Sequence, residues 1–541
     1  MDSKVFIDLL AKRSESKFEQ LPEKITSTMP KKEPTYDPAL GVIYRVLEPY
    51  YTRQAVDDVM QAMLAGEVSS GTQWPRRMAE QICKLYSVPV AMPTSSGASA
   101  LHVSLLCIGV YGFEVIVPAF TMVAVSNAVK LAGAIPVFAD SAPDNLNPGL
   151  AELKSKKTVR TKAVIICHTY GIVCPDIREI AEWCKEEKIQ LIEDICESMG
   201  ARVGMHPKPE DPSTGRYLLA GAFGDFSCSS LYANKQITAG DGGWVHSTHP
   251  GQAGRLKSLI NHGFDPAFHF LHFETAPNAK INGLGAAFIN SQLGEALHEQ
   301  IDQRHRVAQW YRSALYAAGL TGFAPSATSS MEVEQDDRQD GEGSGTGGSA
   351  TPPAGTSATD AKTTDVRRGG PTASPVPGRC GSQFPLKGID EAYAGTCFFD
   401  APWVFGIECW DRITRDNLRQ YLAECGVETR NYFFPLHVQP VMYYEYAQGV
   451  AGSYASWESE LPNSLRFATC GLYLPTHSYL KLTDVEFIVG CCKKFYQNPA
   501  GGAAGQGESS VKGSGEACTP EKPQRAKGWV DRVRSEMFQK S

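Results

Sequence analysis

Between Val88 and Ile192 the sequence alternates between short apolar runs and longer helical patterns. The apolar runs lie at 88–92, 114–118, 135–139, 163–167 and 189–192. Strands that alternate with helices of roughly 10–15 residues form a mostly parallel sheet with helices on both faces. Ligands of such sheets bind outside the carboxyl ends of the strands. The sequence therefore predicts an α/β fold whose functional residues follow the strands.

The chain has 541 residues, which is too long for one ordinary domain. A continuous helical pattern from Leu284 to Tyr316 predicts a long helix. Two segments rich in Gly, Ser, Thr, Pro and Ala are predicted to be disordered because they cannot bury enough apolar surface. We expect a loose N-terminal arm over 1–35, a large domain over 36–300, a smaller C-terminal α/β domain over 301–325 and 383–497, a disordered insertion over 326–382 and a low-complexity tail over 498–541.

Charge and composition exclude several classes of protein. The net charge of −7 and the pI near 6.0 argue against a nucleic-acid or anionic-membrane partner. No apolar run approaches the roughly 18 residues of a membrane span, and the start lacks a secretory signal. The fifteen cysteines lack zinc-site spacing, so we expect no metal. These features predict a reduced, cytoplasmic protein.

A single lysine, Lys235, lies among small, hydroxyl and aromatic residues between Gly221 and Val245. A lysine usually reaches solvent, and this stretch alone favours that interpretation. The alternative is a partly desolvated amine, which can attack a carbonyl and form a Schiff base. The local sequence leaves both open.

Three further features precede this lysine. The turn Thr94–Ala98 lies between a strand and a helix, where it either caps the helix or binds an anion through backbone N–H groups. Asp194 ends a strand, where it either caps the next helix or pairs with a protonated ring nitrogen. His168 also ends a strand and is either a core histidine or a participant. Together with Lys235, these are the parts that pyridoxal phosphate requires.

The segments TSSGASALHVSLL, LIEDICESMGA and FGDFSCSSLYANKQITAGDGG carry a family resemblance. The sequence resembles the DegT/DnrJ/StrS-type nucleotide-sugar aminotransferases from about Ile43 to Phe495, outside the insertion. These are fold-type-I pyridoxal-phosphate enzymes. The resemblance implies a large domain with a mostly parallel seven-stranded-type sheet, a smaller C-terminal α/β domain, glutamate as amino donor and a homodimer with shared active sites.

The resemblance also implies roles for residues at matching positions. Lys235 would join the cofactor and move the proton between cofactor and substrate carbons, and Asp194 would pair with the ring nitrogen. The other implied cofactor-binding residues are Gly97, Ala98 and Ser230 at the phosphate, Glu197 and Met122 near the ring, and Asn278 at the phosphate of the neighbouring subunit. His168, Lys280 and Arg430 would lie on the substrate side.

Several positions differ from the common family pattern, and they bear on the substrate. Ala98 replaces a threonine, Met122 replaces an aromatic residue, and Lys280 replaces an arginine. The ANKQIT stretch resembles the Gly-Asn-Lys-x-Ile-Thr form of perosamine synthases, which favours a GDP-linked 4-keto-6-deoxy sugar as substrate. Lys235 disfavours the dehydrating branch of the family, which has histidine there.

Other functions stay open at this point. One is amino transfer to a different keto sugar or to a keto cyclitol, and another is a non-catalytic regulatory or scaffold protein that binds the cofactor. A plain dinucleotide-binding protein is less consistent with the sequence because no GxGxxG follows the first strand.

Overall fold

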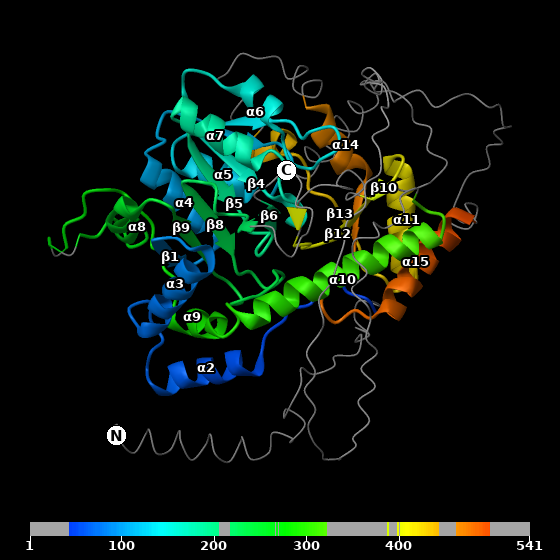
Figure 1. The fold of residues 1–541 in the computed structure, drawn as a ribbon, viewed down its shortest axis with the longest axis horizontal. Coiled ribbons are helices and arrows are strands. Elements are labelled where there is room, and N and C mark those ends of the chain that lie inside the picture. Colours follow the sequence, from blue (N-terminus) through cyan, green and yellow to red (C-terminus); the bar gives the residue numbers. More distant parts are fainter. Residues whose placement is uncertain are drawn as a thin grey trace, which may run out of the picture. The chain divides into compact units, whose positions relative to one another are not determined.

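The computed structural model describes residues 43–204, 217–265, 267–268, 270–321, 387–388, 398–399, 401–442 and 461–497. All of them belong to one compact unit of the chain, drawn as coloured ribbon in Figure 1. The predicted N-terminal arm, insertion and tail lie outside the described residues. The predicted boundary between two domains near residue 300 stays a prediction.

A seven-stranded sheet forms the centre of the fold, in the order β1-β9-β8-β5-β4-β2-β3. Its strands are β1 (Val90–Thr94), β2 (Glu114–Pro118), β3 (Ile135–Ala139), β4 (Thr161–Cys167), β5 (Gln190–Asp194), β8 (Phe226–Ser230) and β9 (Gly243–Ser247). Five strands run parallel from β8 to β3, and β9 is antiparallel to both of its neighbours. The prediction of a mostly parallel, seven-stranded-type sheet is confirmed.

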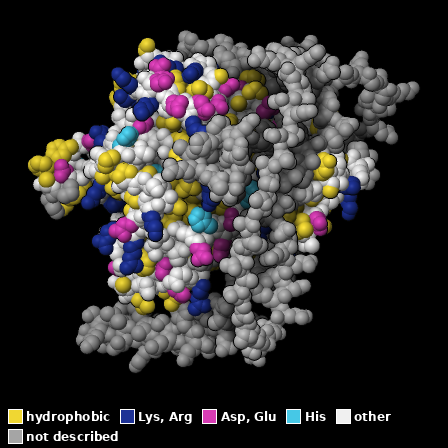
Figure 2. Space-filling view, viewed as in Figure 1, with side chains coloured by type: hydrophobic (Ala, Val, Ile, Leu, Met, Phe, Trp, Pro, Cys, Tyr) yellow, Lys and Arg dark blue, Asp and Glu magenta, His cyan; other side chains and the backbone are white. Residues whose placement is uncertain are grey.

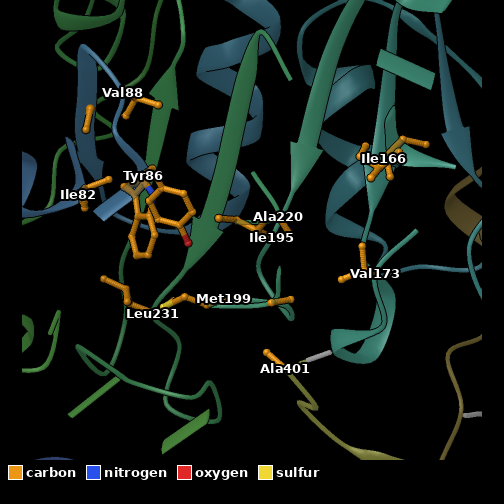
Figure 3. Close-up of a cluster of buried hydrophobic side chains, with 14 of the residues drawn as sticks. Ile82, Tyr86, Val88, Ile166, Val173, Ile195, Met199, Ala220, Leu231 and Ala401 are labelled. Atoms are coloured by element: carbon orange, nitrogen blue, oxygen red, sulfur yellow. The ribbon is translucent and has the colours of Figure 1, made fainter. Parts of the chain in front are cut away.

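Helices bury both faces of this sheet because its strands alternate apolar side chains between the faces. Val115 and Val117 of β2 join a core with the helices on one face, while Ile116 joins the core on the other face. The helices around the sheet are α2 (Arg53–Leu64), α3 (Gln73–Tyr86), α4 (Gly97–Ile108), α5 (Ala124–Leu131), α6 (Leu150–Lys156), α7 (Ile177–Glu187), α8 (Ala253–Leu259) and α9 (Gly283–Asn290). Figure 3 shows how Tyr86 of α3, Ile166 of β4 and the distant Ala401 contribute to one of these cores.

The predicted long helix from Leu284 to Tyr316 is instead two helices, α9 and α10 (Glu295–Ala317). The buried Gln292 side chain donates a hydrogen bond to the Thr238 carbonyl at 2.9 Å, three residues after Lys235. The interruption therefore anchors the lysine segment.

A second, four-stranded antiparallel sheet has the order β10-β12-β14-β13. Its strands are β10 (Lys387–Gly388), β12 (Phe405–Glu408), β13 (Arg430–Asn431) and β14 (Gly471–Leu474). The helices of this region are α10, α11 (Arg412–Glu424), α14 (Pro462–Cys470) and α15 (Leu482–Gln497), and α10, α11 and α15 share one apolar core with the sheet. A third, small sheet joins β11 (Phe398–Phe399), β6 (Arg202–Gly204) and β7 (Tyr217–Leu219). In the described part of the chain, no helix is long and apolar enough to cross a membrane.

His246 on β9 makes the stability of this fold depend on pH. Its ring accepts a hydrogen bond from the Trp244 indole at 3.1 Å, donates one to the Gly221 carbonyl at 2.8 Å, and stacks on Tyr86. Burial lowers its pKa to about 4, although the Gly221 carbonyl and the charge of Glu193 oppose the shift. His246 is therefore neutral in the folded protein.

We predict that the free energy of unfolding is highest above pH 6.5 and falls between pH 6.5 and 4. In this range the unfolded chain binds a proton that the folded protein excludes, which costs about 3 kcal/mol by pH 4. A His246→Gln variant should lack this part of the pH dependence in denaturant titrations at pH 7.5 and pH 4.5. His298→Gln, which removes an exposed histidine of α10, is the control. An unchanged pH slope in His246→Gln would contradict the prediction.

Candidate active site

The turn between β1 and α4 presents free backbone donors. Ser96 caps α4, since its side chain accepts a hydrogen bond from the Ser99 N–H at 3.0 Å. The N–H groups of Gly97 and Ala98 have no hydrogen-bond partner within the described residues. Such groups at the start of a helix bind anions. The hydroxyl of Ser99 contacts those of Ser95 and Ser96.

Glycines let this turn lie close to the ends of β8 and β9. A Cβ atom on Gly97 would lie 2.8 Å from the Cys196 sulfur and 3.0 Å from Cβ of Ser230. A Cβ atom on Gly243 would lie 2.7 Å from the Gly97 nitrogen. These approaches are too short for any larger residue, so both glycines are required by packing. They bring the free N–H groups beside Ser230.

Asp194 is the last residue of β5 and lies between Cys167 of β4 and Cys228 of β8. Its Oδ1 accepts the Cys196 N–H at 2.9 Å, and its Oδ2 contacts the Cys167 thiol at 3.8 Å. Burial, and then the charge of Asp194, raise the pKa of the Cys167 and Cys196 thiols well above the usual value. The thiols therefore stay neutral, and among the described residues no cation pairs with this buried carboxylate.

Lys235 lies in the connection between β8 and β9 and is only 7% exposed. Its Nζ is 3.5 Å from Oε1 of Glu197 and 3.9 Å from the centroid of the Trp403 ring. Burial raises the pKa of Glu197, and the nearby charge of Lys235 opposes that shift. The amine is therefore buried beside a carboxyl group and an aromatic face, and it does not reach solvent.

Glu197 and Trp403 are joined by the backbone of Tyr170. The Tyr170 N–H donates to Oε2 of Glu197 at 2.9 Å, and the Tyr170 carbonyl accepts the Trp403 N–H at 3.0 Å. Tyr170 has a φ of 61°, which is rare for a large side chain and marks a residue held by its surroundings. The next residue, Gly171, has no room for a Cβ atom, because it would lie 2.1 Å from the Ala401 carbonyl.

The sequence did not predict Trp403, Tyr170 or the buried Arg304 as parts of this site. Arg304 of α10 donates to the carbonyls of Trp403 and Lys235 at 2.9 and 3.3 Å. Burial lowers its pKa to about 10. These contacts join segments that are distant in the sequence, so a local pattern does not reveal them. The Tyr170-Gly171 pair is the one local sign, since a glycine there is typical of a turn.

His168 does not join this group. Its Nδ1 accepts the Cys174 N–H at 3.0 Å, and its Nε2 lies 3.1 Å from Oε2 of Glu193, so both ring nitrogens are used. The ring is fully buried, and Glu193 precedes Asp194 on β5 and so faces the other side of the sheet. The expected substrate contact of His168 does not fit this placement. The placement fits the other interpretation of the sequence, in which His168 is a core histidine.

Glu193 is fixed by the backbone as well as by His168. It accepts hydrogen bonds from the N–H groups of Gly221, Phe223 and Gly224 at 2.6–2.8 Å. Burial alone would raise its pKa, but the hydrogen bonds from His168, Gly221 and Gly224 lower it below the usual value. This carboxylate therefore holds the segment that leads into β8.

Two further predicted residues, Arg430 and Met122, are exposed at the protein surface. Arg430 of β13 is exposed, its side chain donates to Oε1 of Glu428 at 3.0 Å, and it lies opposite Tyr473 in the sheet. Met122, between β2 and α5, is 48% exposed. Tyr473 in turn contacts the rings of Tyr170 and Trp403, so it lies between Arg430 and the buried residues around Lys235.

Lys280 and Asn278 lie beside the anion-binding turn of the same chain. Lys280 pairs with Thr94, and the carbonyl of Ala279 accepts the Ser95 N–H at 2.7 Å. The Lys280 amine donates to the side chain of Asn261, and partial burial lowers its pKa. Asn278 is exposed, and its expected contact with a neighbouring subunit stays a prediction.

These features fit pyridoxal phosphate. The turn offers free N–H groups in a cradle that a Cβ atom would fill. Asp194 offers a buried carboxylate that no cation of the described ranges pairs with, and Lys235 offers a buried amine. An anion site, a pyridinium partner and an amine at the carboxyl ends of one sheet define a fold-type-I pyridoxal-phosphate enzyme.

Comparison with known proteins gives the family. Residues 49–335 match the model of the DegT/DnrJ/EryC1/StrS aminotransferase family. The chain is 28% identical over 466 residues to GDP-perosamine synthase of Vibrio cholerae, covering 86% of this chain and 99% of the relative. It is 31% identical over 264 residues to GDP-perosamine synthase of Caulobacter vibrioides, covering 49% and 67%.

A solved structure shares the fold. It is the PLP form of the putative sugar aminotransferase Spr1654 from Streptococcus pneumoniae, with a TM-score of 0.61, 16% identity, and coverage of 84% of this chain and 98% of that one. The chain belongs to the DegT/DnrJ/EryC1/StrS aminotransferase family. It is a pyridoxal-phosphate-dependent sugar aminotransferase.

Proposed function

We propose that this aminotransferase converts a GDP-linked 4-keto-6-deoxy sugar to the amino sugar, with glutamate as amino donor. The observation that carries the proposal is the buried Lys235 amine beside Glu197, at the sheet edge that also holds Asp194 and the anion-binding turn. The choice of sugar is supported by the Asn-Lys-x-Ile-Thr stretch at 234–238 and by the two similar proteins named GDP-perosamine synthase.

We assign the cofactor contacts to four groups. The N–H groups of Gly97 and Ala98 and the Ser230 hydroxyl would hold the phosphate. The Asp194 carboxylate would keep the ring nitrogen protonated, because a buried negative charge favours a cation beside it. Pyridoxal phosphate, when bound, supplies the electron sink of the reaction.

Lys235 is the proposed covalent attachment point and general acid/base. Its Nζ is held in the protein interior, where it would accept and return the proton of the reacting carbon. Glu197 lies 3.5 Å from this nitrogen and orients it. Met122 would cover the face of the cofactor ring. Lys280, half-buried beside the anion-binding turn, and the exposed Arg430 would contact the sugar nucleotide.

A panel of GDP-, UDP- and dTDP-linked 4-keto-6-deoxy sugars tests the choice of substrate. Each sugar is incubated with glutamate and the loaded enzyme, and products are identified by mass spectrometry. We expect an aminated product from the GDP-linked sugar and none, or far less, from the others. Amination restricted to UDP- or dTDP-linked sugars would refute the proposed substrate and leave the aminotransferase intact.

We also propose that the enzyme works as a homodimer. A hairpin after α8 carries four exposed apolar side chains: Phe268, Phe270, Leu271 and Phe273. Figure 2 shows hydrophobic side chains gathered at the projecting end that Figure 1 draws beside α8. Exposed apolar groups of this kind mark interaction surfaces. The hairpin leads directly to Asn278, beside the anion-binding turn.

The homodimer predicts that a Phe270→Asp/Phe273→Asp protein will be a monomer in sedimentation experiments while the wild type is a dimer. Two charges in an apolar interface lose hydration without gaining partners. Tyr111→Asp is a matched control, because this aromatic side chain is 82% exposed and lies outside the hairpin. An unchanged dimer in the double variant would refute the role of the hairpin.

A further inference from the structure

The Lys235 amine rests on an aromatic face that the reaction scheme above does not use. Its Nζ lies 3.9 Å from the centroid of the Trp403 ring, within the range of a cation–π contact. Trp gives the strongest such contact of the aromatic residues, and burial strengthens it. Both partners are buried here, at 7% exposure for Lys235 and 4% for Trp403.

Three hydrogen bonds fix the ring relative to the lysine segment. The Trp403 indole N–H donates to the carbonyl of Asn234 at 2.8 Å. Arg304 bridges the carbonyls of Trp403 and Lys235. The indole bond holds the ring to the residue before Lys235, and the two Arg304 bonds hold the Trp403 backbone to that of Lys235. The position of the ring over the amine is therefore built into the fold.

The surroundings of the ring add to this. The backbone N–H of Trp403 donates to the carbonyl of Tyr170, and the backbone N–H of Tyr170 donates to the Glu197 carboxylate. Phe433 stacks on the Trp403 ring with centroids 6.3 Å apart. The Lys235 Nζ thus contacts a carboxylate, that of Glu197, and an aromatic ring, that of Trp403. They are placed by the same residue, Tyr170.

We infer that Trp403 is a positioning residue that holds the free Lys235 ammonium whenever this amine is not attached to the cofactor. The inference rests on the proposed role of Lys235. A complete cycle of amino transfer would release the lysine in the first half-reaction and re-attach it in the second, so the free amine needs a defined place from which to return. The Trp403 face and the Glu197 carboxylate provide that place.

The test measures how fast Lys235 reacts in the cofactor-free protein. A small amine-reactive ester modifies neutral amines, and peptide mass spectrometry gives the rate at Lys235 with the exposed Lys257 as internal reference. Trp403→Leu should speed the Lys235 reaction roughly 5- to 30-fold, because the contact that favours the ammonium is lost. Trp403→Phe keeps an aromatic face and should stay within about three-fold of the wild type.

The controls distinguish loss of the cation–π contact from loss of steric shielding of Lys235 and from misfolding. Both substitutions replace Trp403 by a smaller side chain and only Phe keeps an aromatic face, so equal rates in the two variants would contradict the inference, as would wild-type rates in both. Trp410→Leu, which alters an exposed tryptophan in the same segment, should react like the wild type. Circular dichroism and thermal unfolding confirm that each protein is folded.

A failure of the proposed function gives a different result. If the sugar panel yields no aminated product but Trp403→Leu still reacts faster than Trp403→Phe, the proposed reaction fails and the contact stands. If amination occurs and the two variants react equally, Trp403 has no positioning role and the proposed reaction stands.

Discussion

A Lys235→Ala protein is expected to lose complete amino transfer by about 10⁴-fold or more, because one nitrogen supplies both the covalent attachment and the proton transfer. Pyridoxal phosphate should still bind, since the turn at Gly97 and Ala98 and the Asp194 carboxylate are unchanged. Initial rates of amino-sugar formation, measured with the cofactor in excess, check the prediction.

Two further variants show whether the chemistry or the charge is responsible. Lys235→Arg keeps a positive charge near Glu197 but cannot attach to an aldehyde, so it should be as inactive as Lys235→Ala. Lys257→Ala removes an exposed lysine of α8 and should retain full activity. Wild-type rates in Lys235→Ala would refute the mechanism.

An Asp194→Asn protein is expected to lose about 10²- to 5 × 10³-fold in rate, because it would remove one partner of the proposed buried ion pair, which costs about 3–5 kcal/mol. The asparagine can still accept the Cys196 N–H, so the fold should survive. The absorbance band of the loaded enzyme should change, because the protonated ring nitrogen loses its partner. Stopped-flow spectra with glutamate measure both effects.

The neighbouring carboxylate provides the contrast. Glu193→Gln removes a charge on the opposite face of β5, where three backbone N–H groups and His168 meet. It should lower the free energy of unfolding by about 2–4 kcal/mol and leave the absorbance band unchanged. A normal rate and band in Asp194→Asn would contradict the assignment of Asp194 to the ring nitrogen.

Much of the sheet was predictable because its signals are local. Strands β2 and β3 begin and end where the apolar runs do, at Glu114–Pro118 and Ile135–Ala139. The helix break between α9 and α10 was not predictable. Between the two helices Gln292 donates a hydrogen bond to the Thr238 carbonyl, and nothing in the apolar periodicity marks that contact.

The site residues likewise include some that the sequence predicted and some that it did not. The turn at Gly97 and the position of Asp194 were predictable because each lies at the end of a strand. Lys235 was assigned from the family resemblance, because its local sequence alone favoured a solvent-exposed lysine. His168 has the same sequence signature as Asp194, yet its ring is bound to Glu193 on the other face of the sheet. Trp403 carries no local signal, because its role depends on a contact made across the fold.

The central claim is that Lys235 is the residue that joins pyridoxal phosphate. Borohydride reduction of the loaded enzyme, followed by peptide mass spectrometry, tests it most directly by fixing the cofactor to its nitrogen. We predict a pyridoxyl group on the peptide that contains Lys235 and its absence from the Lys235→Ala protein. A pyridoxyl group on another lysine, or on none, would contradict the account.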